Sequence, residues 1–241
     1  MQLIIDVGNT RIKMAVFDAD QMVAKMTTSL TQFVESLGGF IGDYPIKKAI
    51  ISSVGRLSKE QSRSVQLRFP TVLLSHTTPL PFVNNYATPE TLGVDRMALV
   101  AAFAKAYPEK NGLIIDAGTC ITYDFINAKG HYKGGAISPG IHLRYQALHN
   151  LTANLPLLEV QMPETIVGDR TETAIHSGVM MGIVKEIDGI IDQYQSDFNV
   201  DTVILTGGDA EILSKRLKNS IFAHSNFLME GLNYILRRTN D

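Results

Sequence analysis

Apolar residues at the start of the chain gather into short runs that polar residues separate. The first three runs read QLIIDVG, IKMAVFD and MVAKMTTS, with the polar triplets NTR and ADQ between them. Runs of this length, bounded by turn-forming residues, are typical of strands joined by tight turns. The N-terminus is therefore predicted to be an antiparallel meander.

Strands and helices alternate over the next part of the chain. Strands are predicted at KKAIISSV and FPTVLLS, with a helix in the polar stretch 57–68 between them. The segment PLPFVNNYATPETLG is rich in Pro, Asn and Thr, which indicates a loop. The segment VDRMALVAAFAKAYP predicts a helix that Pro108 ends.

The opening pattern then restarts. The runs GLIIDAG, CITYDFI and GHYKGGAIS repeat the meander, and LIIDVGNT at 3–10 is matched by LIIDAGTC at 113–120. The repeat predicts a mixed α/β fold of two duplicated domains, 1–108 and 109–241. The terminal helix could pack back on the first domain.

The rest of the chain is predicted to be mostly helical. Helices are expected in PGIHLRYQALHNL, over 171–195 and over 227–238, and TVILTGGDAEILSKRL predicts a strand, a double glycine and a helix. One face of the 171–195 helix is apolar, which predicts core or a dimer interface rather than a cofactor site. Its members are Ile175, Val179, Ile183, Ile187, Ile190 and Tyr194.

Composition excludes several classes of function. The net charge is −2 and the Lys and Arg residues are scattered, so no basic patch for nucleic acid or anionic lipid is expected. A single cysteine, Cys120, excludes an internal disulfide and a thiolate zinc site. His142, His149 and His176 show no metal-ligand spacing and are assigned to ordinary surface or core positions. The chain opens in a strand without a leader-like segment or an apolar run of about 20 residues, so a cytoplasmic location is predicted.

The duplicated turns carry the candidate chemistry. Asp6 and Asp116 end equivalent strands and are expected to face each other across a cleft between the domains. Backbone N–H groups at glycine turns can cradle phosphates, and a carboxylate can hold a hydrated Mg²⁺ ion. A third turn, Gly207-Gly208, would let the backbone approach a flat ligand such as adenine. One Asp-x-Gly turn alone is commonly structural, but the three turns together favour a nucleotide site.

The order of the motifs resembles that of the type III pantothenate kinases over essentially the whole chain. The motifs are Asp6-x-Gly8-Asn9-Thr10 with Lys13, GVDR at 93–96, Asp116-x-Gly118-Thr119, GGAISPG at 134–140 and GDRT at 168–171. The chain contains neither a GxxxxGK[ST] loop nor the HRD and DFG motifs of protein kinases. The resemblance implies two ribonuclease-H-like domains of the acetate and sugar kinase, heat-shock ATPase and actin superfamily. Each would be a mixed sheet with helices. One departure is visible, because Asp169 stands where the commoner GKNT motif has Lys.

The resemblance also implies a role for each motif. Asp95 would accept the proton of the substrate hydroxyl, and Asp116 would bind a monovalent cation, K⁺ or NH₄⁺. Thr171 would reach the substrate from the second subunit of a homodimer. The other substrate-binding residues would be Tyr86, Gly93, Val94 and Arg96. Asp6 would bind ATP and hold the Mg²⁺ ion that accompanies it. The other ATP-binding residues would be Val7, Gly8, Asn9, Thr10, Arg11, Ile12, Lys13 and Thr119.

Structural explanations remain open for three of these residues. An acidic residue in a first helical turn, such as Asp95, is favoured by the helix dipole alone. Thr171 could be the N-cap of the following helix. Tyr86 could be a partly buried anchor in a Pro-rich loop.

The activity that the resemblance implies is ATP-dependent phosphorylation of pantothenate to 4′-phosphopantothenate, the first step of coenzyme A biosynthesis. One alternative is a non-catalytic nucleotide-binding regulator of the same fold, which would have no reason to keep Asp6, Asp95, Arg96, Asp116 and Thr119 together. Another is an actin-like or phosphatase ATPase. The GVDR motif disfavours it, because Asp-Arg is a substrate-binding pair and supplies no water-positioning Gln or Glu.

Overall fold

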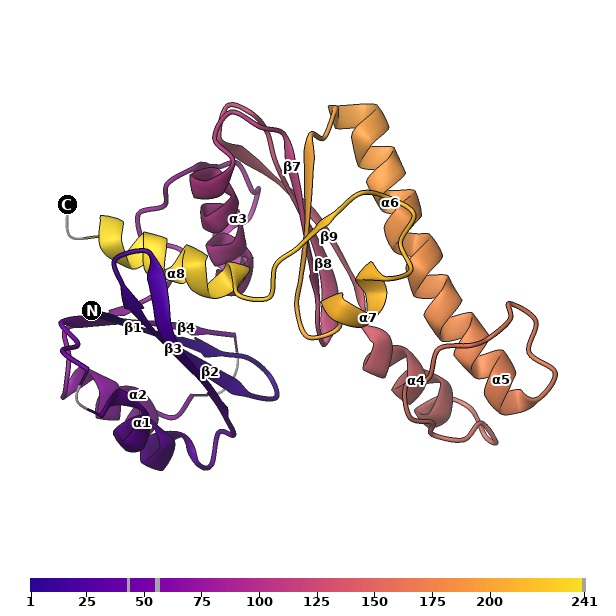
Figure 1. Cartoon of the computed structure of the whole chain (residues 1–241), viewed down its shortest axis with the longest axis horizontal. Helices are drawn as coiled ribbons and strands as arrows, with labels where there is room; N and C mark the ends of the chain where they lie inside the picture. Colours follow the sequence, from indigo (N-terminus) through magenta and orange to yellow (C-terminus); the bar gives the residue numbers. More distant parts are fainter. Residues whose placement is uncertain (43, 55–56, 240–241) are drawn as a thin grey trace. The chain divides into compact units, whose positions relative to one another are not determined.

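The computed structural model describes residues 1–42, 44–54 and 57–239. The chain divides into two compact units, each with its own mixed sheet and helices (Figure 1). The first unit comprises Met1–Pro108, Gly130–Tyr132 and Asn226–Asp241, and the second comprises Glu109–Lys129 and Lys133–Ser225. The predicted class, a mixed α/β fold with two sheets, is confirmed.

The sheet of the first unit has the strand order β3-β2-β1-β4-β5. Strands β1 (Gln2–Val7), β2 (Ile12–Asp18) and β3 (Gln21–Thr28) are antiparallel neighbours, which confirms the predicted meander. Strands β4 (Lys48–Ser53) and β5 (Thr71–Leu73) continue the sheet in parallel with β1. The run FPTVLLS therefore provides only a three-residue strand.

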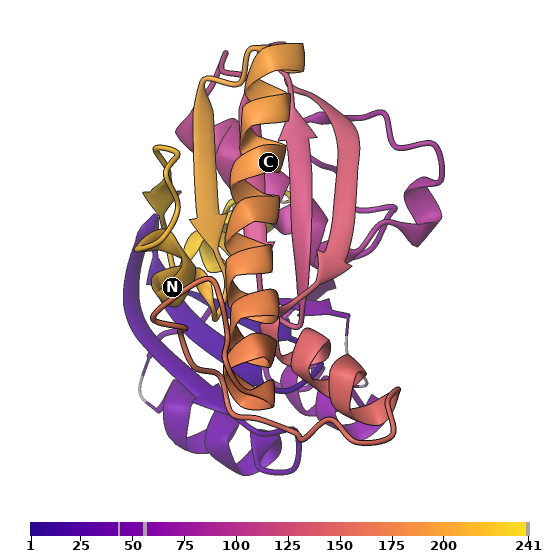
Figure 2. The same cartoon turned by 90° about the vertical axis from the view of Figure 1, so that its right-hand side faces the viewer.

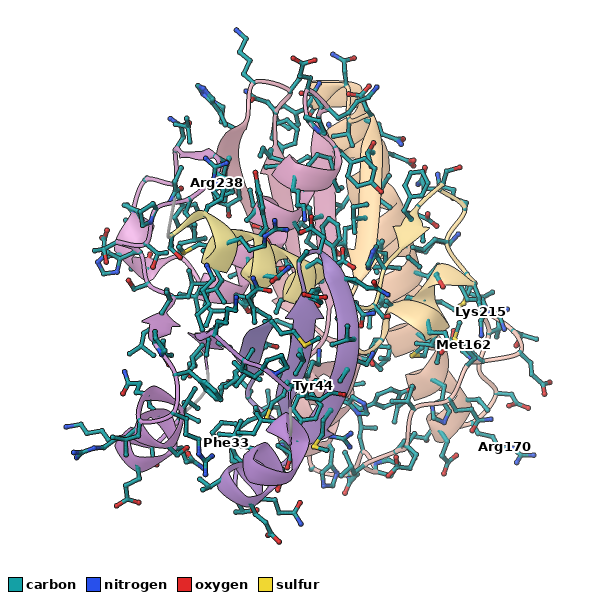
Figure 3. The ribbon with its side chains drawn as sticks, turned by 60° about the vertical axis from the view of Figure 1, so that its left-hand side comes forward. Phe33, Tyr44, Met162, Arg170, Lys215 and Arg238 are labelled. Carbon is teal, nitrogen blue, oxygen red and sulfur yellow. The ribbon has the colours of Figure 1, made fainter. Side chains whose placement is uncertain are left out.

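Helices cover both faces of this sheet. Helix α1 (Phe33–Ile41) packs Phe33, labelled in Figure 3, and Leu37 against one face, together with α2 (Lys59–Gln66). Helices α3 (Val94–Ala106) and α8 (Phe227–Arg238) lie on the other face, where α8 contacts β1 and β4 (Figure 1). Helix α1 was not predicted, because its Gly-Gly pair weakens the helical pattern.

Close packing of α3 against α8 depends on a glycine. A Cβ atom at Gly231 would lie 1.9 Å from the carbonyl oxygen of Ala98, so only glycine lets the two backbones approach this closely. Lys105 on α3 and Arg237 on α8 both pair with Asp20, in the β2–β3 turn. These contacts hold α3, and with it the GVDR motif at its start, on the sheet.

The sheet of the second unit repeats the meander. Strand β7 (Gly112–Ala117) pairs antiparallel with β8 (Cys120–Ile126), and β9 (His131–Pro139) follows β8 in the sheet. On the other side β7 pairs in parallel with β10 (Thr202–Thr206), which pairs in parallel with β11 (Phe222–Ala223). The two-residue strand β6 (Val83–Asn84) belongs to the first unit and pairs in parallel with His131 and Tyr132, the residues at the start of β9 that belong to the same unit.

The predicted 171–195 helix extends from 171 to 198 in three consecutive segments. Helix α5 (Thr171–His176) passes through a π-helical turn (Ser177–Met181) into α6 (Gly182–Phe198), which lies across one face of the sheet in Figure 2. Ile175, Val179, Ile183 and Ile187 on its apolar face are buried in the core of the unit, and Ile190 and Tyr194 pack against that core. Helices α4 (Ile141–Asn150) and α7 (Ala210–Ser214) complete the unit.

Two further details differ from the sequence expectations. The segment expected as a loop at 79–93 contains β6 and a 3₁₀ turn at Pro89–Thr91. Strand β11 was not predicted, because two residues are too short to give a periodic signal. Within the part of the chain that the structure describes, no helix has both the length and the apolar character needed to cross a bilayer.

Candidate functional site

The first Asp-x-Gly turn follows β1. The N–H of Gly8 donates to the carbonyl oxygen of Arg11 over 3.1 Å and closes the turn. The side chains of Val7 and Ile12 are fully buried in the hydrophobic core. Those two residues could therefore contact a ligand only through their backbones, whereas Asn9, Thr10, Arg11 and Lys13 are exposed.

Asp6 is the charged residue that this turn buries. It is only 6% exposed, and its register partners are Lys13 in β2 and Ser52 in β4. Burial raises the pKa of Asp6 to about 6. The charge of Lys13 opposes this rise, and the charge of Asp95 adds to it. A desolvated carboxylate beside another carboxylate gains from a cation placed against it.

The GVDR motif begins helix α3. The backbone N–H of Arg96 donates to Oδ1 of Asp95 over 2.8 Å, and Gly93 is the N-cap residue. A Cβ atom at position 93 would lie 2.5 Å from Oδ1 of Asp95, so a larger residue there would push the carboxylate out of its present position. Burial raises the pKa of Asp95, and its bond from the Arg96 backbone opposes that rise. Asp95 does lie in the first turn of α3, as the helix-dipole explanation also requires.

The side chain of Arg96 lies against an aromatic pair. Arg96 is only 5% exposed, and its guanidinium carbon lies 5.7 Å from the ring centroid of Tyr86. Tyr86 stacks on Tyr132 with centroids 6.1 Å apart and ring planes at 23°. The first unit thus brings together Tyr86 with Gly93, Val94, Asp95 and Arg96. A guanidinium and a tyrosine side by side suit a ligand with carboxylate and amide oxygens.

The second Asp-x-Gly turn follows β7. Its Asp116 has Thr122 and Thr206 as register partners in β8 and β10. The N–H of Gly140 donates to the carbonyl oxygen of Thr119 over 3.0 Å, and a Cβ atom at Gly140 would lie 2.1 Å from the carbonyl oxygen of Gly118. The GGAISPG motif therefore ends against this turn, while the side chain of Thr119 remains exposed.

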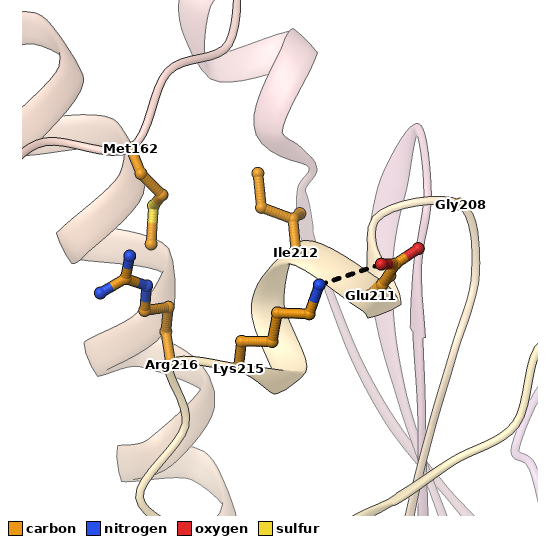
Figure 4. A pocket seen from close by; sticks show the side chains of 6 residues that line it. All are labelled: Met162, Gly208, Glu211, Ile212, Lys215 and Arg216. Atoms are coloured by element: carbon orange, nitrogen blue, oxygen red, sulfur yellow. Dashed lines mark hydrogen bonds and ion pairs between the residues drawn. The ribbon is translucent and has the colours of Figure 1, made fainter.

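A pocket opens beside the third glycine turn. Gly207 has a φ of 98°, and a Cβ atom there would lie 2.2 Å from the carbonyl oxygen of Ala117, so the position demands glycine. The pocket has a volume of about 580 Å³. On its wall, the ammonium group of Lys215 donates a hydrogen bond to the carboxylate of Glu211 over 3.0 Å (Figure 4). Its lining residues are Met162, Gly208, Glu211, Ile212, Lys215 and Arg216.

Sequence reasoning missed two residues near these turns. Burial raises the pKa of Asp209, which follows the double glycine, and His142 opposes that rise. Ser52 was also missed, because a serine inside an apolar strand carries no motif signal. Only the pairing of β4 with β1 places it next to Asp6.

Thr171 is exposed at the first position of α5. The N-cap residue is Arg170, so the alternative explanation of Thr171 as the N-cap was wrong. The hydroxyl of Thr173 takes the capping role instead. It accepts a hydrogen bond from the backbone N–H of Arg170 over 3.0 Å and donates one to Oδ1 of Asp169 over 3.2 Å. Arg170 itself projects outward in Figure 3.

No cluster of three or more His, Cys, Asp or Glu side chains that could enclose a metal ion occurs in the described ranges. Each of the first two turns instead presents one aspartate at a strand end. Such a turn suits an ion that keeps water and phosphate oxygens as most of its ligands, which is the usual behaviour of Mg²⁺. The residues around Asp6 therefore fit a magnesium–nucleotide complex better than a metal cage made of protein ligands alone.

Comparison with known proteins decides the family. Residues 2–193 match the family model of type III pantothenate kinases. The chain belongs to the type III pantothenate kinase family. The type III pantothenate kinase of Flavobacterium johnsoniae is 49% identical over 233 residues, covering 96% of each chain. The family assignment made from the motifs is thus confirmed.

Solved structures show the fold. A Campylobacter jejuni protein named as a Baf family transcriptional activator superposes with a TM-score of 0.67 at 22% identity, covering 99% of this chain and 98% of that one. The ROK family glucokinase of Streptomyces griseus, with glucose and AMPPNP, gives a TM-score of 0.52 at 11% identity and 98% coverage of both chains. The fold is therefore that of the sugar kinases and actin-like ATPases, with two ribonuclease-H-like domains.

Proposed function

We propose that this chain transfers the γ-phosphoryl group of ATP to the terminal hydroxyl of pantothenate, giving 4′-phosphopantothenate for coenzyme A biosynthesis. Family membership supports this activity, with ATP and a divalent metal ion as the phosphoryl-donor complex. The observation that carries the proposal is the cluster of Asp95, Arg96 and Tyr86 in the first unit, close enough to Asp6 for the two carboxylates to interact.

Asp95 is the proposed base. In the transfer, the pantothenate hydroxyl oxygen bonds to the γ-phosphorus, the bond from phosphorus to the β–γ bridging oxygen breaks, and ADP leaves. The hydroxyl proton passes to the carboxylate of Asp95. Phosphoryl transfer depends mainly on an aligned nucleophile and on neutralised charge, so one carboxylate that orients the hydroxyl is sufficient.

Arg96, Tyr86 and the GVDR backbone are proposed to bind pantothenate. The guanidinium can bond to carboxylate or amide oxygens, and its position over Tyr86 fixes its orientation. Gly93 and Val94 offer backbone to the same ligand, because the glycine leaves room beside Asp95. Thr171 is proposed to complete the pocket of the neighbouring subunit in a homodimer, which its exposed position permits.

The ATP phosphates are proposed to bind the turn at 6–13 and Thr119. A bound Mg²⁺ ion would neutralise charge on the phosphate oxygens, with Asp6 holding it through water. Lys13, directly opposite Asp6, supplies a further positive charge. The adenine is proposed to enter the pocket beside Gly208, where Met162 and Ile212 offer apolar surface.

Asp116 is proposed to bind a monovalent cation. The buried hydroxyl oxygen of Thr122, its register partner, has no hydrogen-bond partner among the described residues and could serve as a neutral ligand. A cytoplasmic location belongs to the same proposal, and the unpaired Cys120 is consistent with a reducing compartment.

Coupled measurement of ADP release tests the function. ADP should form rapidly with ATP and pantothenate together and only slowly with ATP alone. Equal rates in the two assays would indicate an ATPase, and no ADP in either would favour the non-catalytic regulator. The kinase is preferred to that regulator because Asp6, Asp95, Arg96, Asp116 and Thr119 are all present.

A further inference from the structure

Ser52, in strand β4, has a hydroxyl group without a hydrogen-bond partner among the described residues. Its side chain is 0% exposed. A buried hydroxyl that makes no bond has lost its contacts with water and gained nothing in return, so alanine would be the more stable residue there. The hydroxyl therefore needs an explanation beyond the stability of the free protein.

The position of Ser52 in the sheet supplies one. Ser52 is the register partner of Asp6 in the parallel pair β1–β4, so both side chains lie on the same face. Ile5 and Ile51, one residue earlier in each strand, lie on the opposite face in the cluster with α1. Paired strands are about 4.8 Å apart, so a side-chain rotation is enough to bring the hydroxyl within bonding distance of the carboxylate.

We propose that Ser52 is a positioning residue for Asp6, an inference that rests on the proposed function. When MgATP or MgADP binds, the Ser52 hydroxyl donates a hydrogen bond to one carboxylate oxygen of Asp6 and leaves the other oxygen to face the ligand. A carboxylate only accepts hydrogen bonds and a hydroxyl can donate one, so the two groups are complementary.

Lys13 and Ser52 then have different roles on the two sides of Asp6. Lys13, from β2, contributes positive charge on an exposed side chain. Ser52, from β4, contributes one directional bond from a neutral, buried hydroxyl. Asp6 held by this bond keeps its other oxygen directed at the magnesium–nucleotide complex, which strengthens binding of that complex.

Two serine variants separate this role from a structural one. Ser36→Ala is the matched control. Ser36 lies on α1, which packs on the opposite face of the same sheet, and its hydroxyl is hydrogen-bonded to that of Thr28 over 2.9 Å. The melting temperature of each free protein and its Kd for MgADP by calorimetry are the two readouts. Ser52→Ala should melt at the wild-type temperature or higher and bind MgADP about tenfold more weakly, which is about 1.4 kcal/mol. Ser36→Ala should melt lower and bind MgADP normally.

Two further arms sharpen the test. Without Mg²⁺, wild type and Ser52→Ala should bind ADP alike, because Asp6 acts through the ion. Ser52→Cys, with a weak donor of similar size, should bind MgADP with intermediate affinity. Wild-type MgADP affinity in Ser52→Ala, or a melting temperature lowered as far as in Ser36→Ala, would overturn the proposal.

The wild-type protein separates this proposal from the proposed function. If it binds MgADP without phosphorylating pantothenate, the proposed function fails while the affinities still decide the role of Ser52. If it does not bind MgADP at all, both fail.

Discussion

Lys13 lies directly opposite Asp6 across the antiparallel strands β1 and β2. In the second copy of the same meander, Thr122 occupies the corresponding position opposite Asp116. The first turn therefore has its own cationic side chain beside the carboxylate, and the second has a neutral hydroxyl. The two copies share a backbone pattern but differ in charge, and a bound cation would remove that difference.

We predict activation by a monovalent cation at Asp116. K⁺ or NH₄⁺ should raise the rate several-fold, and Na⁺ should be poorer because its smaller radius fits the same oxygen ligands badly. The assay is run in Tris or tetramethylammonium buffer, with and without KCl at matched ionic strength. Asp116→Ala should lose the activation, whereas Asp169→Asn, which removes an exposed charge elsewhere in the same unit, should keep it. Full activity in the cation-free buffer would exclude the site.

Asp95→Asn should lower kcat by about 100-fold or more, because a positioned base typically contributes that much. The substituted amide keeps the shape of the side chain and its acceptor for the Arg96 N–H, so the melting temperature should change little. Glu90→Gln, an exposed carboxylate in the preceding 3₁₀ turn, is the matched control and should be fully active. Near-normal turnover in purified Asp95→Asn would remove Asp95 from the mechanism.

The pH profile should report the buried base. Burial raises the pKa of Asp95, and only its ionised form can accept the hydroxyl proton. Activity should therefore be complete at neutral pH and fall as the pH drops through a midpoint above about 4, the ordinary value for aspartate. The measurement is kcat/KM for pantothenate against pH at saturating MgATP, so that the bound ion keeps Asp6, with its pKa of about 6, ionised, and in buffers where the melting temperature is constant. A midpoint at or below the ordinary aspartate value would contradict the assignment.

Complementation tests the shared site. If Thr171 serves the partner's pocket, inactive Asp95→Asn chains and inactive Thr171→Val chains should regain activity when mixed. Random exchange of subunits in a two-fold dimer repairs about a quarter of the sites, which sets the expected recovery. Light scattering establishes the dimer, and each variant refolded alone is the control. A monomer, or verified heterodimers without activity, would refute the arrangement.

The local pattern of the sequence was enough to predict most of the elements. Alternating apolar runs and turn residues give the two meanders, because the burial pattern of a strand and the tight turn that follows it depend on residues a few positions apart. The apolar repeat over 171–195 predicted the long helix for the same reason. The last residue of that repeat, Tyr194, packs against the core as the repeat indicates. The family also followed from the sequence, since the order of its motifs along the chain requires no knowledge of distances.

What the tertiary structure decided is which distant residues are neighbours. Arg96 lies over Tyr86, and the charge of Asp95 adds to the raised pKa of Asp6, although about ninety positions separate these two aspartates. Ser52 carries no motif, and only the parallel pairing of β4 with β1 places its hydroxyl beside Asp6. Local propensity selects helices and strands, whereas pairing of strands and packing of helices determine which side chains share a face. The electrostatics of a buried carboxylate depend on those neighbours, so they are properties of the folded chain alone.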